Sequence, residues 1–394
     1  MPPRFHSLRF SPSKGEVWGN CALSTLLNQS DGVENEFMRR GTQAHAIGEA
    51  LIREKLKLTD FDGEAKSVEQ VKKECDLLDA EMEEIAEGYS EAFISKFDYE
   101  KSRSFNTPLV YLEQYVITDF EKDGSSGGTL DGAIYSDADG GTLIIIDLKT
   151  GRTPVYAFDK AANHMSFQLA IYAAYFYENV LKGIYPVKNV ELVIYQPLIK
   201  NTNSYTCTLE ELLEFREKVI LPAVAKANEE KLEAVVGSHC SKCNGRATCA
   251  ALAKKAEAVQ TDKEINQLSD EEIGNLLPMM FLLKKYVDDF IENATSRAKD
   301  GTKFPGYKLV VSKVSRKIAD EDKVAEILKA EGIDPYGPGK LITITEITKK
   351  LGKKRTKELI SPYLTTQESG LVLVENQDPR EEANISKGEE NHED

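Results

Sequence analysis

The sequence predicts an α/β fold in which a mixed β-sheet is flanked by helices and followed by a mainly helical C-terminal extension. Helical periodicity dominates residues 13–98, three strand-like stretches follow, and a helix, a strand and a helix then alternate up to residue 230. This order of elements is typical of a sheet covered by helices. The 394 residues suffice for two domains, and the pattern changes near residues 258–266.

Composition and charge exclude several classes of protein. The chain is 41% hydrophobic and 29% charged, as expected for a globular protein with a sizeable core. No apolar run reaches about 18 residues and no apolar signal segment begins the chain, so we expect a cytoplasmic protein without a membrane span. No P-loop pattern is present, so ATP hydrolysis by that route is not expected. The net charge of −15 argues against a basic nucleic-acid coat but allows a local basic track.

Three helices are predicted in the N-terminal part. Residues 13–28 begin with Ser13 and Glu16, which have the spacing of a capping box. Residues 42–56 and 67–98 carry apolar side chains at helical spacing.

Strands and helices alternate after the Asn-Thr-Pro break that ends this helical part. Two of the strands are joined through Asp-Ala-Asp-Gly-Gly, which is a hairpin signal. The expected strands cover 109–117, 128–135, 142–148 and 190–199, and the expected helices cover 160–182 and 208–230.

The hairpin keeps charged residues beside its most apolar segment. Asp147 ends the run Leu-Ile-Ile-Ile-Asp, and Asp131 lies in the preceding strand. Buried carboxylates need a partner, and Mg²⁺ or Mn²⁺ is a strong partner for two that converge. Residues i and i+2 of a strand share a face, so Asp147 and Lys149 are expected at one site while Leu148 points into packing and offers its carbonyl to the metal. The pattern favours metal-assisted phosphodiester hydrolysis, and a solvated strand end is the alternative.

Two further pairs of candidate residues lie on predicted helices. His45 and Glu49 are four residues apart, as are Gln168 and Tyr172, so each pair shares a helical face. Each pair alone is more typical of an ordinary helix surface than of a functional site.

Taken together and in order, these motifs resemble the RecB-like branch of the PD-(D/E)XK nuclease superfamily. The motifs are Gly-Thr-x-x-His at 41–45, Gly-x-x-Asp at 128–131, Asp-x-Lys at 147–149 and Gln-x-x-x-Tyr at 168–172. The resemblance covers roughly residues 12–255 and implies a restriction-endonuclease-like core with metal-dependent DNA exonuclease activity. Leu130 stands where the family pattern has proline.

The resemblance also assigns roles to individual residues. It implies that His45, Asp131 and Asp147 hold the metal and that Lys149 is the catalytic lysine. It implies that Gln168 and Tyr172 contact the substrate strand or support the site. Glu113 is a further acidic candidate, and Arg39, Arg40, Arg152 and Lys160 flank the site as candidate phosphate contacts.

Four of the six cysteines are candidates for a metal cluster. Cys240, Cys243 and Cys249 lie within ten residues, and Cys21 is the expected fourth ligand. Their spacing leaves zinc and an iron–sulfur cluster open. Nucleases of the AddB type and of CRISPR adaptation have a similar arrangement, and this resemblance implies a [4Fe–4S] cluster that joins the first helix to the end of the domain. Cys75 and Cys207 are expected to be ordinary packing residues.

The sequence predicts three parts: a nuclease domain over 1–258, a DNA- or partner-binding extension over 259–375 and an acidic disordered tail over 376–394. The most basic stretch of the chain lies in the extension, where phosphate contact and a solvated helix face are both open. Its cations are Lys349, Lys350, Lys353, Lys354, Arg355 and Lys357.

The whole chain also resembles a family of phage and prophage proteins, through residues 195–197, 304–310 and 370–380. This resemblance implies a role in phage DNA recombination, replication or end processing within the bacterial host. Single- or double-stranded DNA is the expected partner, and a phage recombination or single-strand-binding protein is a further one. A catalytically weak DNA-end-binding or recombination-mediator protein and a zinc-containing virion protein are the alternatives.

Overall fold

The computed structural model describes residues 9–27, 36–58, 66–123, 125–160, 162–257, 268–312, 314–337, 340–368 and 370–383. The chain divides into two compact units, Met1–Leu283 and Lys284–Asp394. The division falls within helix α10 (Asp270–Lys299). The boundary predicted after residue 258 lies outside the described residues.

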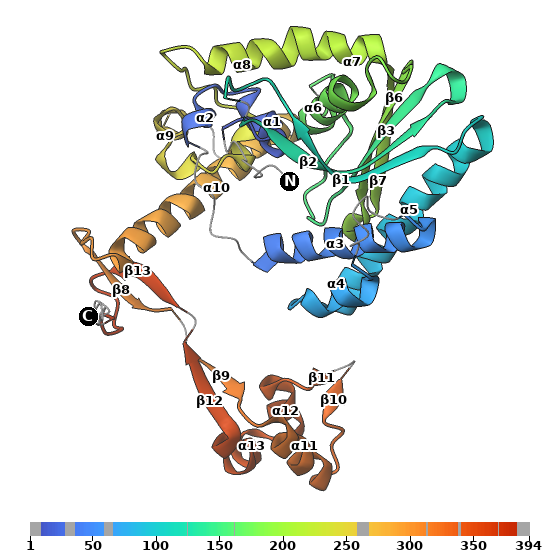
Figure 1. The fold of residues 1–394 in the computed structure, drawn as a ribbon. Helices are drawn as coiled ribbons and strands as arrows, with labels where there is room; N and C mark the ends of the chain where they lie inside the picture. Colours follow the sequence, from blue (N-terminus) through green and yellow to red (C-terminus); the bar gives the residue numbers. More distant parts are fainter. Residues whose placement is uncertain are drawn as a thin grey trace, which may run out of the picture. The chain divides into compact units, whose positions relative to one another are not determined.

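The first unit is built on a five-stranded mixed sheet with strand order β1-β2-β3-β6-β7 (Figure 1). Its strands are β1 (Leu109–Ile117), β2 (Gly127–Ser136), β3 (Thr142–Leu148), β6 (Asn189–Gln196) and β7 (Asn201–Thr208). Neighbouring strands are antiparallel, except for β3 and β6, which are parallel. The sheet confirms the predicted α/β class. Strand β7 was not predicted, because its sequence is mostly polar and lacks an apolar alternation.

Helices cover both faces of this sheet (Figure 1). One face holds α3 (Glu36–Leu56) and α5 (Ala80–Arg103), and the other holds α6 (Phe167–Phe176), α7 (Leu209–Phe215) and α8 (Leu221–Ala227). Leu143 and Ile145 of β3 pack on the α6 side, while Ile144 and Ile146 pack on the side of α3 and α5. This alternation along β3 directs Asp147 toward α6.

Two helix predictions in the N-terminal part were wrong in extent. Residues 13–28 form the short helices α1 (Gly15–Trp18) and α2 (Ser24–Leu27) instead of one helix. The predicted capping box does not form, because the Glu16 carboxylate accepts a hydrogen bond from the backbone N–H of Phe167 at 3.1 Å. Glu16 therefore serves the start of α6, a helix 151 residues further along the chain.

The helix predicted over 67–98 is two helices, α4 (Val68–Glu74) and α5. Asp79 accepts a hydrogen bond from the backbone N–H of Met82 and so caps α5. The expected helix over 160–182 begins later, at Phe167, because a short hairpin of β4 (Phe158–Asp159) and β5 (His164–Met165) precedes it.

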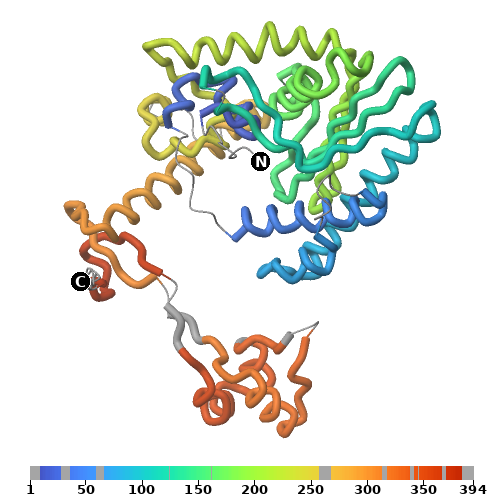
Figure 2. Tube along the Cα trace, viewed as in Figure 1, coloured from blue at the N-terminus to red at the C-terminus, as the bar shows by residue number. Residues whose placement is uncertain are grey.

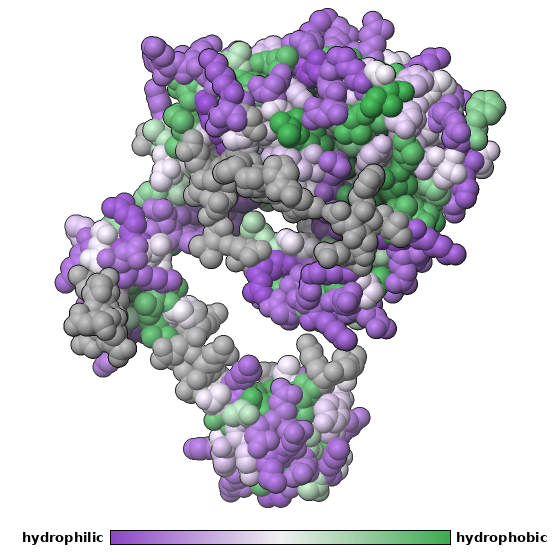
Figure 3. All heavy atoms as spheres, in the orientation of Figure 1, coloured by the Kyte–Doolittle hydropathy of each residue, from purple (hydrophilic) through white to green (hydrophobic). Residues whose placement is uncertain are grey.

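The second unit combines helices with paired strands. Strand β8 (Tyr307–Val311) pairs with β13 (Leu371–Glu375), and β9 (Val314–Ile318) pairs with β12 (Leu364–Glu368). Between β9 and β12 lie α11 (Glu321–Ala330), α12 (Ile344–Leu351) and α13 (Lys353–Leu359). Val324, Leu328, Ile342, Ile347 and Ile360 form a buried core for these helices. The part of this unit displayed in Figure 3 carries both hydrophilic and apolar side chains.

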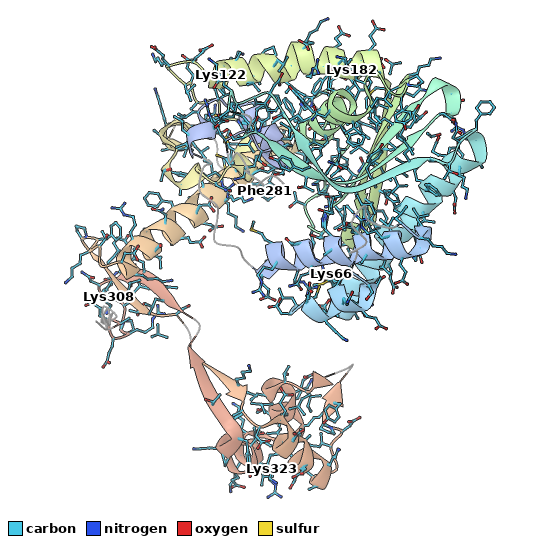
Figure 4. The ribbon with its side chains drawn as sticks, viewed as in Figure 1. Lys66, Lys122, Lys182, Phe281, Lys308 and Lys323 are labelled. Atoms are coloured by element: carbon cyan, nitrogen blue, oxygen red, sulfur yellow. The ribbon has the colours of Figure 1, made fainter. Side chains whose placement is uncertain are left out.

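Residues 376–383, which were predicted to belong to a disordered tail, have defined contacts with β8. Lys308, labelled in Figure 4, donates hydrogen bonds to the carbonyls of Asp378 and Arg380, and the Ala383 N–H donates to the Leu309 carbonyl. These backbone contacts extend the ordered chain beyond the prediction. Residues 384–394 lie outside the described residues.

Within the described ranges, no helix has the length and apolar character needed to cross a membrane.

Candidate metal and nuclease site

His45 and Asp131 meet at the centre of the candidate site, from α3 and β2. His45 Nδ1 lies 3.2 Å from Asp131 Oδ1, and the backbone N–H of Leu148 donates to Asp131 Oδ2 at 2.7 Å. Burial alone would lower the pKa of His45, but the charge and hydrogen bond of Asp131 raise it to about 9. Burial acts against ionisation of Asp131, but His45, Lys149 and the Leu148 N–H lower its pKa overall.

A second network joins Asp147, Lys149 and Gln168. Lys149 Nζ lies 2.8 Å from Asp147 Oδ2 and donates to Gln168 Oε1 at 2.9 Å, while Gln168 Nε2 donates to Asp147 Oδ1 at 3.0 Å. Asp147 is only 2% exposed, and burial raises its pKa to about 6 although Lys149 acts in the opposite direction. Burial disfavours the charged form of Lys149, but Asp147 and Asp131 raise its pKa.

Leu148 lies between these two charged residues and points the other way. Its side chain is buried with those of α3 and α5, as the alternation of the strand predicted. The role of its carbonyl as a metal ligand stays a prediction.

Glu113 completes a group that can hold a metal ion. The ligand atoms of His45, Glu113 and Asp131 all lie within 4.8 Å of one another. Glu113 lies on β1 between two residues that pair with the neighbours of Asp131, and its φ of +48° is unusual for a residue within a strand. Positive φ values at residues other than glycine concentrate at functional sites. Asp147, which the resemblance also assigns to the metal, lies outside this close group and instead contacts Lys149 and Gln168.

Tyr172 supports this arrangement from α6, one turn after Gln168. Its side chain is 4% exposed, and burial and the nearby charges of Asp147 and Asp131 raise its pKa. A Cβ atom at Gly128 would lie 2.9 Å from the Tyr172 hydroxyl oxygen. The glycine of the Gly-x-x-Asp motif therefore leaves room for this tyrosine.

Tyr89 was missed by the sequence analysis. It lies on α5, is 2% exposed, and has no hydrogen-bond partner for its hydroxyl among the described residues. Burial and the charges of Asp131, Glu113 and Asp147 raise its pKa well above the ordinary value. Nothing in the amphipathic pattern of residues 80–103 distinguishes this tyrosine from a core residue.

An open pocket of about 660 Å³ leads to His45 and Glu113. Its outer wall includes Phe37, which is 84% exposed, and Met38. The first turn of α3 therefore gives this pocket an apolar wall beside His45 and Glu113.

The predicted phosphate contacts near this pocket already have partners. Arg39 pairs with Asp76, Arg40 lies 2.5 Å from Asp79, and Arg152 lies 3.2 Å from Glu81. Lys160 is exposed. To bind phosphate, the three arginines would have to break their ion pairs with these carboxylates.

The four predicted cluster ligands line one small pocket. Cys21, Cys240, Cys243 and Cys249 surround it together with His239. Figure 2 shows the N-terminal segment in blue beside the yellow segment that carries the other three cysteines. No three of these thiols lie within 4.8 Å of one another among the described residues. Cys75 and Cys207 do not line the pocket.

Neighbouring groups lower the pKa of two of these thiols, those of Cys21 and Cys240, whereas burial raises the pKa of Cys243. The N–H groups of Val235 and Gly237 lie 3.5 Å from Cys21 Sγ and Cys240 Sγ, respectively. Burial alone would raise the pKa of Cys21 and Cys240, but His239 and these backbone contacts lower both. Burial raises the pKa of Cys207 to about 11, as expected for a packing thiol.

Comparison with known proteins gives a family and similar solved structures. A crystal structure titled "Crystal structure of SSO0001" is 16% identical over 53% of this chain and 84% of its own length, with a TM-score of 0.22. A TM-score this low does not bear on the fold or the site. The family model described as "Protein of unknown function (DUF2800)" matches residues 6–381. Because the match spans nearly the whole sequence, the chain belongs to this DUF2800 family.

Proposed function

We propose that this chain is a metal-dependent DNA nuclease of the RecB-like PD-(D/E)XK type. One observation carries the proposal: the close group of His45, Glu113 and Asp131 lies next to the buried pair of Asp147 and Lys149. Carboxylate and imidazole ligands suit a divalent cation, and a fixed ammonium suits a phosphate whose negative charge grows during hydrolysis.

The residues present fit Mg²⁺ or Mn²⁺. Asp147 Oδ2 is fully buried and has no hydrogen bond of good geometry, although the Lys149 ammonium is close, so the oxygen retains capacity to bind a cation. His45, Glu113 and Asp131 would hold the ion, with Asp147 and the Leu148 carbonyl as further ligands. When bound, such an ion polarises the phosphate and lowers the pKa of a coordinated water.

The protein's own residues orient the reacting groups. Asp147 and Gln168 hold the Lys149 ammonium, which can then donate a hydrogen bond to a phosphate oxygen or to the attacking water. Gln168 also fixes the Asp147 carboxylate, and Tyr172 lies one turn after Gln168 on α6. The resemblance to RecB-like nucleases implies products with a 3′-hydroxyl and a 5′-phosphate.

We further propose an exonuclease that processes DNA ends during phage recombination or replication. The support for this finer statement is the ordered set of motifs and the resemblance to phage and prophage proteins. The open pocket beside His45 and Glu113 is compatible with the entry of a single strand.

The four cysteines are proposed to bind a [4Fe–4S] cluster. The four thiols line one pocket, with one cysteine before the candidate site in the sequence and three after it. This order resembles that of nucleases of the AddB type and of CRISPR adaptation, and the resemblance favours a cluster over a single zinc ion. The backbone N–H groups directed at Cys21 and Cys240 suit anionic thiolates.

The direct test uses end-labelled single- and double-stranded DNA with Mg²⁺, Mn²⁺ or EDTA. We expect metal-dependent loss of label and, in its place, short products with 3′-hydroxyl ends. Binding of DNA ends without cleavage under either metal would contradict the nuclease proposal and favour a mediator that retains the fold.

A further inference from the structure

Helices α12 and α13 of the second unit carry the most basic stretch of the chain. Between Ile344 and Ile360 the sequence contains six cations and two carboxylates, although the whole chain has a net charge of −15. Gly352 alone joins the two helices, and its φ of +81° turns the chain between them. The six positive charges therefore occupy two short, directly connected helices.

Packing decides which side chains of these helices face solvent. Ile347 of α12 and Ile360, just after α13, are fully buried against Val324 and Leu328 of α11, and Thr356 is also buried. Lys349, Lys350, Lys353, Lys354 and Lys357 are all exposed. Because the apolar side chains of both helices pack into this core, the lysines remain on the solvent-exposed surface of α12 and α13.

These five lysines differ from Lys323 and Arg355 of the same unit, because no carboxylate partner is found for them among the described residues. Arg355 donates to Glu331 at 2.7 Å and so ties α13 to the end of α11. Lys323, labelled in Figure 4, lies 3.1 Å from Glu326. None of the five lysines forms an ion pair with a residue that the structure describes. Like charges four residues apart, such as Lys353 and Lys357, repel each other and weaken a helix.

We infer that the exposed lysine face of α12 and α13 binds the phosphate backbone of DNA, as a second contact separate from the candidate nuclease site. Phosphates would offset the repulsion among the lysines and release their own condensed counterions. Lysines that contact only phosphates position DNA without reading its sequence. The arginines near the nuclease pocket are paired with carboxylates, so this face offers the positive charge that they do not.

The test is a salt series with full-length protein that carries Asp147→Asn, so that DNA stays intact. Fluorescein-labelled duplex DNA of random sequence is titrated, and binding is followed by fluorescence anisotropy. The variant with Lys353→Gln, Lys354→Gln and Lys357→Gln is compared with a control that carries Lys226→Gln, Lys254→Gln and Lys255→Gln. The control removes the same charge from exposed lysines of the first unit.

We expect the α13 variant to bind DNA at least about tenfold more weakly. The slope of its plot of log affinity against log salt concentration should become shallower by up to about 2.7, which is about 0.9 for each of three lost phosphate contacts. Replacing the same three lysines by arginine should preserve both values. Circular dichroism and the thermal midpoint establish that each variant is folded.

Three outcomes would overturn the inference: an unchanged slope, an equal loss in the control variant, or displacement of the DNA by poly-glutamate at the same charge concentration. The inference does not require cleavage. If DNA binding depends on these lysines but the wild-type protein does not cleave DNA with Mn²⁺, the inference about the lysine face stands and the nuclease proposal is wrong. If the wild-type protein cleaves DNA but binding does not depend on these lysines, the nuclease proposal stands and the inference is wrong.

Discussion

The ammonium of Lys149 lies 2.8 Å from the carboxylate of Asp147, two residues earlier, and the two side chains differ sharply in exposure. The Asp147 side chain is 3% exposed and that of Lys149 is 24% exposed. The buried partner therefore fixes the position of the ammonium, and the ammonium is partly open to solvent.

Lys149→Met should reduce metal-dependent DNA cleavage by about a hundredfold or more, because the ammonium that stabilises the phosphate charge is lost. It should also lower the free energy of unfolding by about 3 kcal/mol at neutral pH, because Asp147 loses its buried partner. Cleavage assays and denaturant titrations measure the two effects.

Lys96→Met is the matched control, since Lys96 forms a comparable 2.8 Å pair with Glu191 away from the site. It should lose stability and keep its activity. Full activity in Lys149→Met would remove the lysine from the catalytic set.

Mn²⁺ should raise the thermal midpoint of the protein, because an ion that binds only the folded state stabilises it by about 2.7 kcal/mol at a hundred times its Kd. Asp131→Asn should abolish this shift, since the change removes one carboxylate from the close group with His45 and Glu113. Differential scanning fluorimetry with and without Mn²⁺ measures it.

Asp137→Asn serves as the control for charge, because the half-buried Asp137 carboxylate lies outside the close group of metal-binding candidates and, among the described residues, accepts hydrogen bonds from residues 105 and 106. Its shift with Mn²⁺ should match that of the wild type. An equal shift in Asp131→Asn would show that the ion binds elsewhere.

The stability of the metal-free protein should fall as the pH rises toward and through about 9. The pKa of His45 rises from 6.5 to about 9 on folding, so its contribution is complete below pH 6.5 and lost as the pH passes through 9. Mn²⁺ needs the neutral imidazole, so its affinity should increase over the same range. Denaturant titrations in EDTA and Mn²⁺ titrations at several pH values measure both trends.

His45→Gln should flatten the stability profile over this range. The pKa of Asp147, raised to about 6, affects metal binding in the same direction as that of His45, because protonation of Asp147 below pH 6 should also weaken Mn²⁺ binding. Mn²⁺ affinity that stays constant from pH 5 to 9 would contradict both assignments.

Cys21→Ser should remove the cluster and lower stability together. Protein purified without oxygen should be brown and absorb near ~400 nm, as thiolate-bound iron–sulfur clusters do. Iron, sulfide and zinc analysis measures the content of wild type and variant. Cys75→Ser is the control, because Cys75 lies outside the cysteine pocket. A colourless wild type with one zinc per chain would overturn the cluster assignment.

The hairpin and its charged residues were predictable because a strand repeats every two residues. That period places Asp147 and Lys149 on one face and Leu148 on the other, and the ion pair and the buried leucine follow from it. The order of the motifs along the chain predicted that His45 and Gln168 belong to the same candidate site. Both residues lie within helices, and their side chains contact Asp131 and Asp147, respectively.

Other features could not be predicted, because they depend on contacts between distant segments. Glu16 has the spacing of a local cap, yet its carboxylate bonds to Phe167 in α6. The positive φ of Glu113 and the position of Tyr89 beside three carboxylates arise only when the sheet and helices pack together. Strand β7 is held by its pairing with β6 and not by an apolar pattern of its own.

The contact between Val235 and Cys21 can form only after the ribosome has made both residues. The two residues are 214 positions apart, so at about 5–20 residues per second a ribosome needs roughly 10 to 40 s to make the second after the first. During that interval Cys21 has none of its partners from the later segment, and its thiol is open to oxidation or to the wrong metal. Slow translation or early termination should therefore damage this protein at Cys21, between α1 and α2, far from the codon at which synthesis stalls.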